Sequence, residues 1–315
     1  MNKQFNLAYF AGGSKFTIDP FLALLASKHK VKIVFTKEPK RSGRGRKKTH
    51  NYLIGEVIKK NIKFIALDNF LNLENIKELN TLDLDFIIVF SFGVILPKEI
   101  LDIPKYGCIN LHTSILPKWR GASPIQHTLL NNEKYAGYSL FIMNEKLDEG
   151  DIIFKEKILI EDRDNYEILL NKIIKLASKS LVIKIEEFVN NNINIEKQDS
   201  NSATYCYRIR KEDTYISLNS SSKEVYGKIR AFSPSPGAKF FLQGELIKIL
   251  EAKIEDEKKV NIKYGVVVDK NLLISCKYGF IRLIKIQREG RKAMLAKDFL
   301  NGWNVKVGTL INEKK

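Results

Sequence analysis

Two polar residues stand two positions apart at the end of an apolar run, and their side chains could act together on a carbonyl group. They are Asn110 and His112, in the run that begins at Cys108. On a strand, residues two apart point to the same face, so both side chains should lie together at its carboxyl end. An amide that donates a hydrogen bond and an imidazole that exchanges a proton suit a reaction in which a carbonyl oxygen gains negative charge while an amine loses a proton. On spacing alone, a polar pair that caps a strand is the commoner explanation.

A group of carboxylates follows the next apolar run. Asp148, Glu149 and Asp151 come after residues 138–143. A carboxylate at such a strand end could orient the imidazole and stabilise its cationic form. Taken by itself, this short acidic segment is more typical of a solvated turn.

The elements that must position these residues follow an alternating pattern. Helical periods, such as those at 19–28 and 53–58, separate apolar runs, and a long amphipathic helix is predicted over 165–189. Strand and helix in alternation predict a Rossmann-like parallel sheet covered on both faces, in which ligands bind beyond the carboxyl ends of the strands. The apolar runs are 7–10, 31–36, 64–67, 86–90 and 108–111.

The pattern changes after residue 189. A polar segment at 190–206 is predicted to be a linker. Short strands parted by turns then predict a small antiparallel β-barrel. We therefore expect a catalytic domain over 1–189 and a second, OB-like domain over 207–315. The expected strands of the second domain are 239–242, 247–250, 264–268, 272–276 and 280–284.

Long runs around the polar residues resemble the 10-formyltetrahydrofolate-dependent formyltransferases. The resemblance is carried by residues 91–97, 110–126 and 147–151. It implies that Asn110, His112 and Asp148 are the catalytic residues and that 10-formyltetrahydrofolate is the co-substrate. It also implies that eight residues line the folate site: Ser114, Ile115, Leu116, Pro117, Phe92, Gly93, Ile95 and Leu96.

A basic segment indicates which member of this superfamily the chain resembles. Residues 37–48 hold seven basic residues against one acidic residue. The segment is similar to the insertion loop of methionyl-tRNA formyltransferases, which wedges into the end of the acceptor stem, and Arg44 matches the residue expected to read the open first base pair of the initiator. Glycines let such a loop reshape while arginines meet phosphates and base edges. Composition alone would favour a disordered basic loop. The residues implied to bind tRNA are Arg41, Arg44, Arg46, Lys47 and Lys48.

The charge of the chain fits a polyanionic partner. Its 315 residues carry a formal net charge of +17, and residues 207–315 contain 23 basic and 12 acidic residues. Such an excess attracts nucleic acid, although a Lys-rich composition can also follow from an AT-rich genome. Residues 229–238 and 288–302 resemble the OB-like domain of the same family, which implies that the charge neutralises tRNA phosphates.

Other classes of protein fit the sequence less well. The three cysteines, Cys108, Cys206 and Cys276, are widely separated, which argues against a disulfide framework or a zinc site, and we expect no metal. No secretory signal or membrane-spanning run is evident, so we expect a cytoplasmic protein, and a monomer is adequate.

Three alternatives remain. A sugar-nucleotide N-formyltransferase would use the same folate donor and the same Asn, His and Asp, but would have little use for a basic loop. A formyltetrahydrofolate hydrolase normally carries its extra domain before the catalytic one. A non-catalytic RNA-binding protein on a retired enzyme scaffold should have lost the catalytic polar residues, and all three are present.

Overall fold

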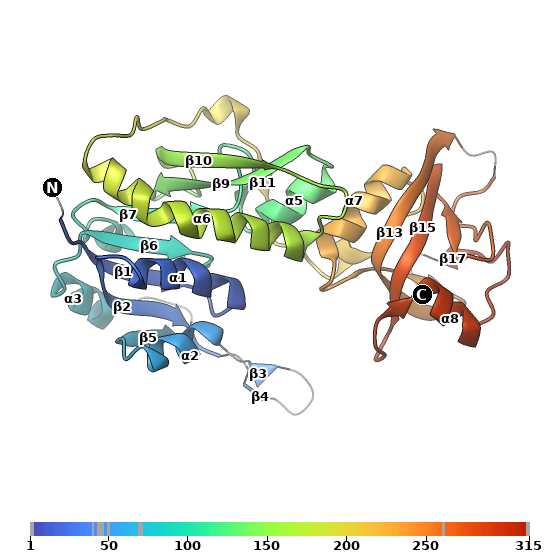
Figure 1. The fold of residues 1–315 in the computed structure, drawn as a ribbon, viewed down its shortest axis with the longest axis horizontal. Coiled ribbons are helices and arrows are strands. Elements are labelled where there is room, and N and C mark those ends of the chain that lie inside the picture. The colour runs from blue at the N-terminus through green and yellow to red at the C-terminus, as the bar shows by residue number, and fades with distance from the viewer. Residues whose placement is uncertain are drawn as a thin grey trace. The chain divides into compact units, whose positions relative to one another are not determined.

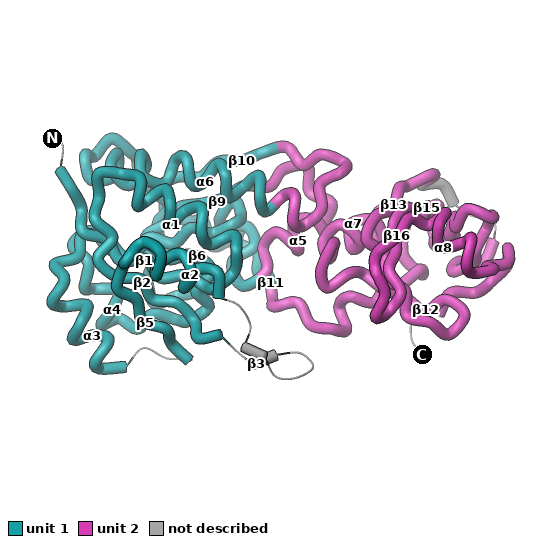
Figure 2. The backbone as a smooth tube through the Cα atoms, turned by 60° about the horizontal axis from the view of Figure 1, so that its bottom comes forward, with its two compact units in different colours: residues 1–122, 137–158, 170–206 teal, residues 123–136, 159–169, 207–315 magenta. Residues whose placement is uncertain are grey.

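The chain folds into two compact units, distinguished by colour in Figure 2. The structure is a computed structural model that describes residues 3–39, 41–42, 47–48, 51–68, 72–259 and 262–312, with backbone only at 41–42, 47–48 and 257–259. Unit 1 comprises residues 1–122, 137–158 and 170–206, and unit 2 comprises residues 123–136, 159–169 and 207–315.

Unit 1 is built on a mixed sheet whose strands follow the order β10-β9-β7-β6-β1-β2-β5 (Figure 1). The strands from β5 to β7 are parallel, and β9 runs antiparallel to β7. The predicted parallel sheet is thus confirmed, with strands at all five predicted runs. The strands are β1 (Asn6–Ala11), β2 (Lys30–Lys37), β5 (Phe64–Leu67), β6 (Phe86–Phe90), β7 (Cys108–His112), β9 (Tyr135–Ile142) and β10 (Ile152–Leu159).

The apolar runs become strands because the middle of the sheet is buried on both faces. Every residue of β6 is buried, as a strand covered on both sides requires. The predicted helix over 165–189 is α6 (Tyr166–Val189), and its fully buried residues, among them Ile173 and Leu181, recur at helical spacing. The other helices before residue 131 are α1 (Ile18–Leu25), α2 (Tyr52–Lys59), α3 (Leu73–Asn80), α4 (Lys98–Leu101) and α5 (Pro124–Leu130), with a 3-10 turn η1 (Lys15–Thr17).

The segment expected to be a linker has a defined structure within unit 1. Its strand β11 (Tyr205–Cys206) pairs in parallel with β8 (Arg120–Gly121), and Glu196 pairs with Ile152. Conversely, residues 123–136 and 159–169, expected in the catalytic domain, cluster with unit 2. The unit boundaries therefore differ from the predicted ones. Hydrogen bonds between polar groups hold residues 190–206 in place, and such bonds produce no apolar pattern that the sequence could reveal.

Unit 2 carries an antiparallel sheet in the order β14-β15-β13-β12-β17, with β16 beside β15. The expected strand at 264–268 contributes two isolated bridges, Val266 with Leu310 and Val267 with Ile274. These bridges join β14 to the residues before β17, so they close the sheet into the small barrel that the sequence predicts. The strands are β12 (Ala238–Leu242), β13 (Glu245–Lys259), β14 (Leu273–Ser275), β15 (Tyr278–Arg288), β16 (Met294–Leu295) and β17 (Ile311–Asn312).

Helix α7 (Ser222–Phe232) precedes the barrel. It begins with a capping box in which Ser221 and Glu224 bond to each other's backbone amides. Within the described ranges, no helix has the length and apolar character needed to cross a membrane. The remaining elements of this part of the chain are η2 (Ser200–Ser202), η3 (Glu212–Thr214) and α8 (Ala296–Gly302).

Candidate active site

The carboxyl end of β7 presents Asn110 and His112 on one face of the unit 1 sheet. Asn110 lies opposite Phe141 and His112 opposite Ser139 on β9. The Asn110 side chain is half-buried, and none of the residues that the structure describes donates a hydrogen bond to it or accepts one from it. Its amide is therefore available to a substrate oxygen at the edge where parallel sheets bind ligands.

The hydrogen bonds of His112 define its protonation pattern. Its Nε2 lies 2.8 Å from the carbonyl oxygen of Trp119. Because a carbonyl can only accept, Nε2 carries a hydrogen. Nδ1 lies 3.7 Å from Oδ2 of Asp148. In the neutral ring Nδ1 therefore holds the lone pair that can take up a proton, and the resulting imidazolium faces a carboxylate.

The carboxylate of Asp148 is held by the backbone of β8. The N–H of Gly121 donates to Oδ2 of Asp148 at 2.8 Å, and the side chain is only 11% exposed. Asp148 has a φ of 49°, a conformation that Asp tolerates better than most residues. The structure thus brings His112 and Asp148 together from β7 and from the turn between β9 and β10, as the sequence predicts.

The same strand also carries a cysteine, Cys108, whose burial argues against a role as a nucleophile. Burial raises the pKa of the Cys108 thiol to about 12. The thiol therefore stays protonated near neutral pH, and the thiolate is the nucleophilic form. His112 and Asp148 remain the candidates for proton transfer at the carboxyl end of β7.

The predicted folate residues after β7 form a loop that is bonded to β9. The Leu116 N–H donates to Ser139 Oγ at 3.0 Å, and that hydroxyl donates to the carbonyl of Ser114 at 2.8 Å. Ser114 Oγ itself donates to the carbonyl of Lys118, and the Leu116 side chain packs with Phe141. The side chains of Ser114 and Leu116 are therefore directed into the protein, whereas those of Ile115 and Pro117 are partly exposed.

The predicted folate residues after β6 divide into buried and exposed side chains. Phe92 and Leu96 belong to the hydrophobic core, where the ring of Phe92 lies 5.3 Å from that of Phe10. The carbonyl of Gly93 accepts a hydrogen bond from Lys37 Nζ at 3.1 Å. Ile95 is 84% exposed. Of these four residues, only Ile95 has a largely exposed side chain.

The residues expected to bind tRNA fall in the least described part of the chain. Arg44 and Arg46 lie outside the described residues. Arg41 and Lys48 pair across a short antiparallel ladder of β3 (Arg41–Ser42) and β4 (Lys47–Lys48). Their side chains are not described, so their proposed contact with tRNA rests on the sequence.

Two residues at the site have roles that the sequence analysis missed. Gln198 Nε2 donates to the carbonyls of Asp148 at 2.9 Å and Gly150 at 2.7 Å. The Nε of Arg120 donates to Gln198 Oε1 at 3.0 Å. Arg120 lies in the run that resembles the formyltransferases and could have been found there, whereas nothing in the polar segment around Gln198 marks it.

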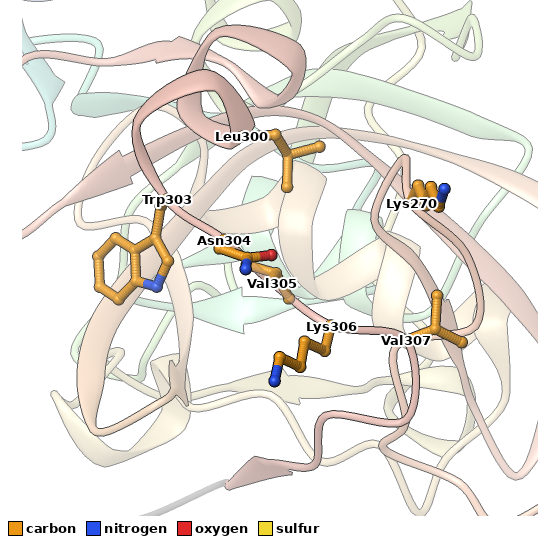
Figure 3. A pocket seen from close by; sticks show the side chains of 7 residues that line it. All are labelled: Lys270, Leu300, Trp303, Asn304, Val305, Lys306 and Val307. Carbon is orange, nitrogen blue, oxygen red and sulfur yellow. The ribbon is translucent and has the colours of Figure 1, made fainter.

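Unit 2 contains a cavity of about 440 Å³ beside α8 (Figure 3). Its wall includes Lys270 and Lys306 and no carboxylate. The guanidinium of Arg288 lies 4.2 Å from the ring centroid of Trp303, so one face of that indole is already covered. The cavity has the charge to receive phosphate but lacks an acid–base pair. Its lining residues are Lys270, Leu300, Trp303, Asn304, Val305, Lys306 and Val307.

The fold and the site define the class as the formyl transferases. A family described as formyl transferase matches residues 6–185, and one described as formyl transferase, C-terminal domain, matches residues 208–304. The chain is 34% identical to the methionyl-tRNA formyltransferase of Fusobacterium nucleatum, over 95% of this chain and 97% of that one. It is 36% identical to that of Pelagibacter ubique, over 96% and 97%. The chain therefore belongs to the methionyl-tRNA formyltransferase family.

A solved structure agrees with the fold. The N-formyltransferase from Helicobacter canadensis, in complex with folinic acid and dTDP-3-aminofucose, is 21% identical and has a TM-score of 0.66. The match covers 91% of this chain and 100% of that chain. At this identity the similarity concerns the fold alone.

Proposed function

We propose that this protein transfers the formyl group of 10-formyltetrahydrofolate to the free amino group of methionyl-initiator-tRNA. The observation that carries the proposal is the approach of His112 to Asp148 beside an Asn110 amide that no described residue uses. Membership of the methionyl-tRNA formyltransferase family selects the acceptor. The proposed partners are the charged initiator tRNA and the folate co-substrate, bound by a monomer in the cytoplasm.

The residues fit a formyl donor of this kind. An amide donor stands at the carboxyl end of β7, where the formyl oxygen would gain charge, and Ile95, after the neighbouring strand β6, is an exposed apolar residue. Across the described residues, no three His, Cys, Asp or Glu side chains form a group able to hold a metal ion. The chemistry we propose is carried by the amide, the imidazole and the carboxylate.

We propose direct transfer. The unprotonated amine attacks the formyl carbon, so a new C–N bond forms while the carbonyl oxygen becomes an oxyanion. Asn110 donates a hydrogen bond to that oxyanion, and His112 takes the proton of the amine on Nδ1. While it is protonated, the imidazolium can hydrogen-bond the oxyanion. The bond from the formyl carbon to N10 then breaks, and the imidazolium gives its proton to N10. The Trp119 carbonyl holds the neutral His112 through its Nε2–H, and Asp148 orients the imidazolium and balances its charge once it has formed.

The test is an assay of labelled formyl transfer from 10-formyltetrahydrofolate to three acceptors. We expect rapid transfer to charged initiator methionyl-tRNA and much slower transfer to elongator methionyl-tRNA. An amino-sugar nucleotide should not be formylated. Preferred formylation of the sugar nucleotide would overturn the proposal and favour the sugar-nucleotide N-formyltransferase.

The charge of unit 2 leads to a prediction about salt. We expect kcat/KM for charged tRNA to fall at least ~10-fold between about 50 and 200 mM KCl, because each neutralised phosphate releases counterions. Replacing Lys270 and Lys306 together by alanine should make the slope of log kcat/KM against log salt shallower by about 2. Lys98→Ala, which removes an exposed lysine of unit 1, is the matched control. A salt slope that the double variant leaves unchanged would exclude this cavity from tRNA binding.

A further inference from the structure

The turn that carries Asp148 is held by one side chain from a distant part of the chain. Gln198 donates both hydrogens of its amide, one to the Asp148 carbonyl at 2.9 Å and one to the Gly150 carbonyl at 2.7 Å. We propose that Gln198 is a positioning residue for Asp148, and that Arg120 orients Gln198 in turn. This inference rests on the proposed catalytic role of Asp148.

The orientation of the Gln198 amide is determined by its partners. Arg120 can only donate, so the atom that faces its Nε at 3.0 Å must be the amide oxygen. The two carbonyls of the turn can only accept, so the atom that faces them must be the amide nitrogen. A flipped amide would lose all three hydrogen bonds, and the side chain therefore has one arrangement at this place.

Arg120 is itself rigidly placed. Its side chain is 1% exposed, and its guanidinium contacts the Tyr205 hydroxyl at 3.3 Å and the Glu149 carboxylate at 3.7 Å. Its backbone N–H donates to the Thr204 carbonyl at 2.9 Å. Arg120 thus links β8 to the segment that carries Gln198. The residue after Arg120 in β8 is Gly121, whose N–H holds the Asp148 carboxylate.

Gln198 thus fixes the backbone of the Asp148 turn, and the Gly121 N–H fixes the Asp148 carboxylate. Asp148 has a positive φ, so its turn needs support from outside. Without Gln198, two carbonyls of the turn lose their donors and the carboxylate can move away from Nδ1 of His112. Misplacement by about 1 Å can cost ~10²-fold in turnover.

The test begins with Gln198→Leu, which has a similar shape and no polar group. We expect kcat to fall about 10- to 100-fold while KM for both substrates stays within ~2-fold, because both ends of the Gln198 amide are already bonded within the protein. Gln198→Glu keeps an acceptor for Arg120, but it replaces the two donors by an oxygen and adds a negative charge, so it should show at least a similar loss. Gln4→Leu is the matched control, because Gln4 also donates to a backbone carbonyl in unit 1, that of Lys28.

A double-mutant cycle with Asp148→Ala separates positioning from a general structural role. If Gln198 acts through Asp148, adding Gln198→Leu to Asp148→Ala should lower kcat less than ~2-fold further. Losses that multiply in the double variant would overturn the inference. Thermal melting checks folding, and if the leucine variant does not fold, the same cycle is run with Gln198→Glu.

The proposed catalytic role of Asp148 and the positioning role of Gln198 can be refuted separately. Nearly full activity of Asp148→Ala would refute the proposed role of Asp148, and the inference would fall with it. An impaired Asp148→Ala beside fully active Gln198 variants would refute the positioning role alone.

Discussion

His112→Ala is expected to lower kcat by ~10²–10³ or more, because it removes the group that takes up the proton of the amine. Asn110→Ala should lose ~10²–10³ through the missing donor to the oxyanion. Asp148→Ala leaves the imidazolium without its counter-charge and should be similarly impaired. Single-turnover formyl transfer at saturating substrates measures the chemical step.

The three variants should still fold, because none of the three residues contributes an apolar side chain to the core. Circular dichroism and thermal melting of each variant provide the control. Asn110 loses no hydrogen bond to a described residue on truncation, so its melting temperature is expected to change least. Retention of nearly full activity by all three variants would contradict the assigned roles.

Gly121→Ala is expected to destabilise unit 1 by about 2–4 kcal/mol and to abolish most activity. Gly121 has a φ of 117°, and a Cβ built there would lie 2.2 Å from the carbonyl oxygen of Cys206. That oxygen belongs to the backbone of β11, so the strand would have to move. The movement would also displace the N–H that holds Asp148, which links stability to turnover. Urea denaturation and single-turnover kinetics measure the two effects.

Gly55→Ala is the matched control for this substitution. Gly55 lies inside α2, and nothing stands within 4 Å of the Cβ that alanine would add. We expect a gain of about 0.5–1 kcal/mol, because alanine favours the helix, and no change in activity. Equal stability of Gly121→Ala and the wild type would show that β11 can shift without cost.

Local spacing predicted that Asn110 and His112 lie together, and the resemblance to formyltransferases supplied their proposed catalytic roles. Asn110 and His112 share a face because strand geometry repeats every two residues, and that relation needs no tertiary contact. The position of Asp148 beside His112 is a long-range contact, and here the resemblance to formyltransferases supplied what periodicity could not.

The boundaries of the two units, by contrast, could not be predicted from local patterns in the sequence. Residues 190–206 have the polar composition of a linker, yet β11 pairs with β8 and Gln198 supports the Asp148 turn. Polar side chains that bond to backbone carbonyls produce no hydrophobic period, so their partners cannot be read from the chain. The burial of Phe92 and Leu96 likewise could not be predicted from the sequence, because it depends on how these side chains pack in the folded core.

The sequence by itself determined the parallel sheet, the barrel and which polar residues stand at the end of the fifth apolar run, because apolar periodicity and residue type are local properties. Only the tertiary structure decided which carbonyl binds Nε2 of His112, which N–H holds Asp148 and which amide supports its turn. Those choices depend on segments tens of residues apart meeting at hydrogen-bond distance, and that meeting is a property of the packed fold.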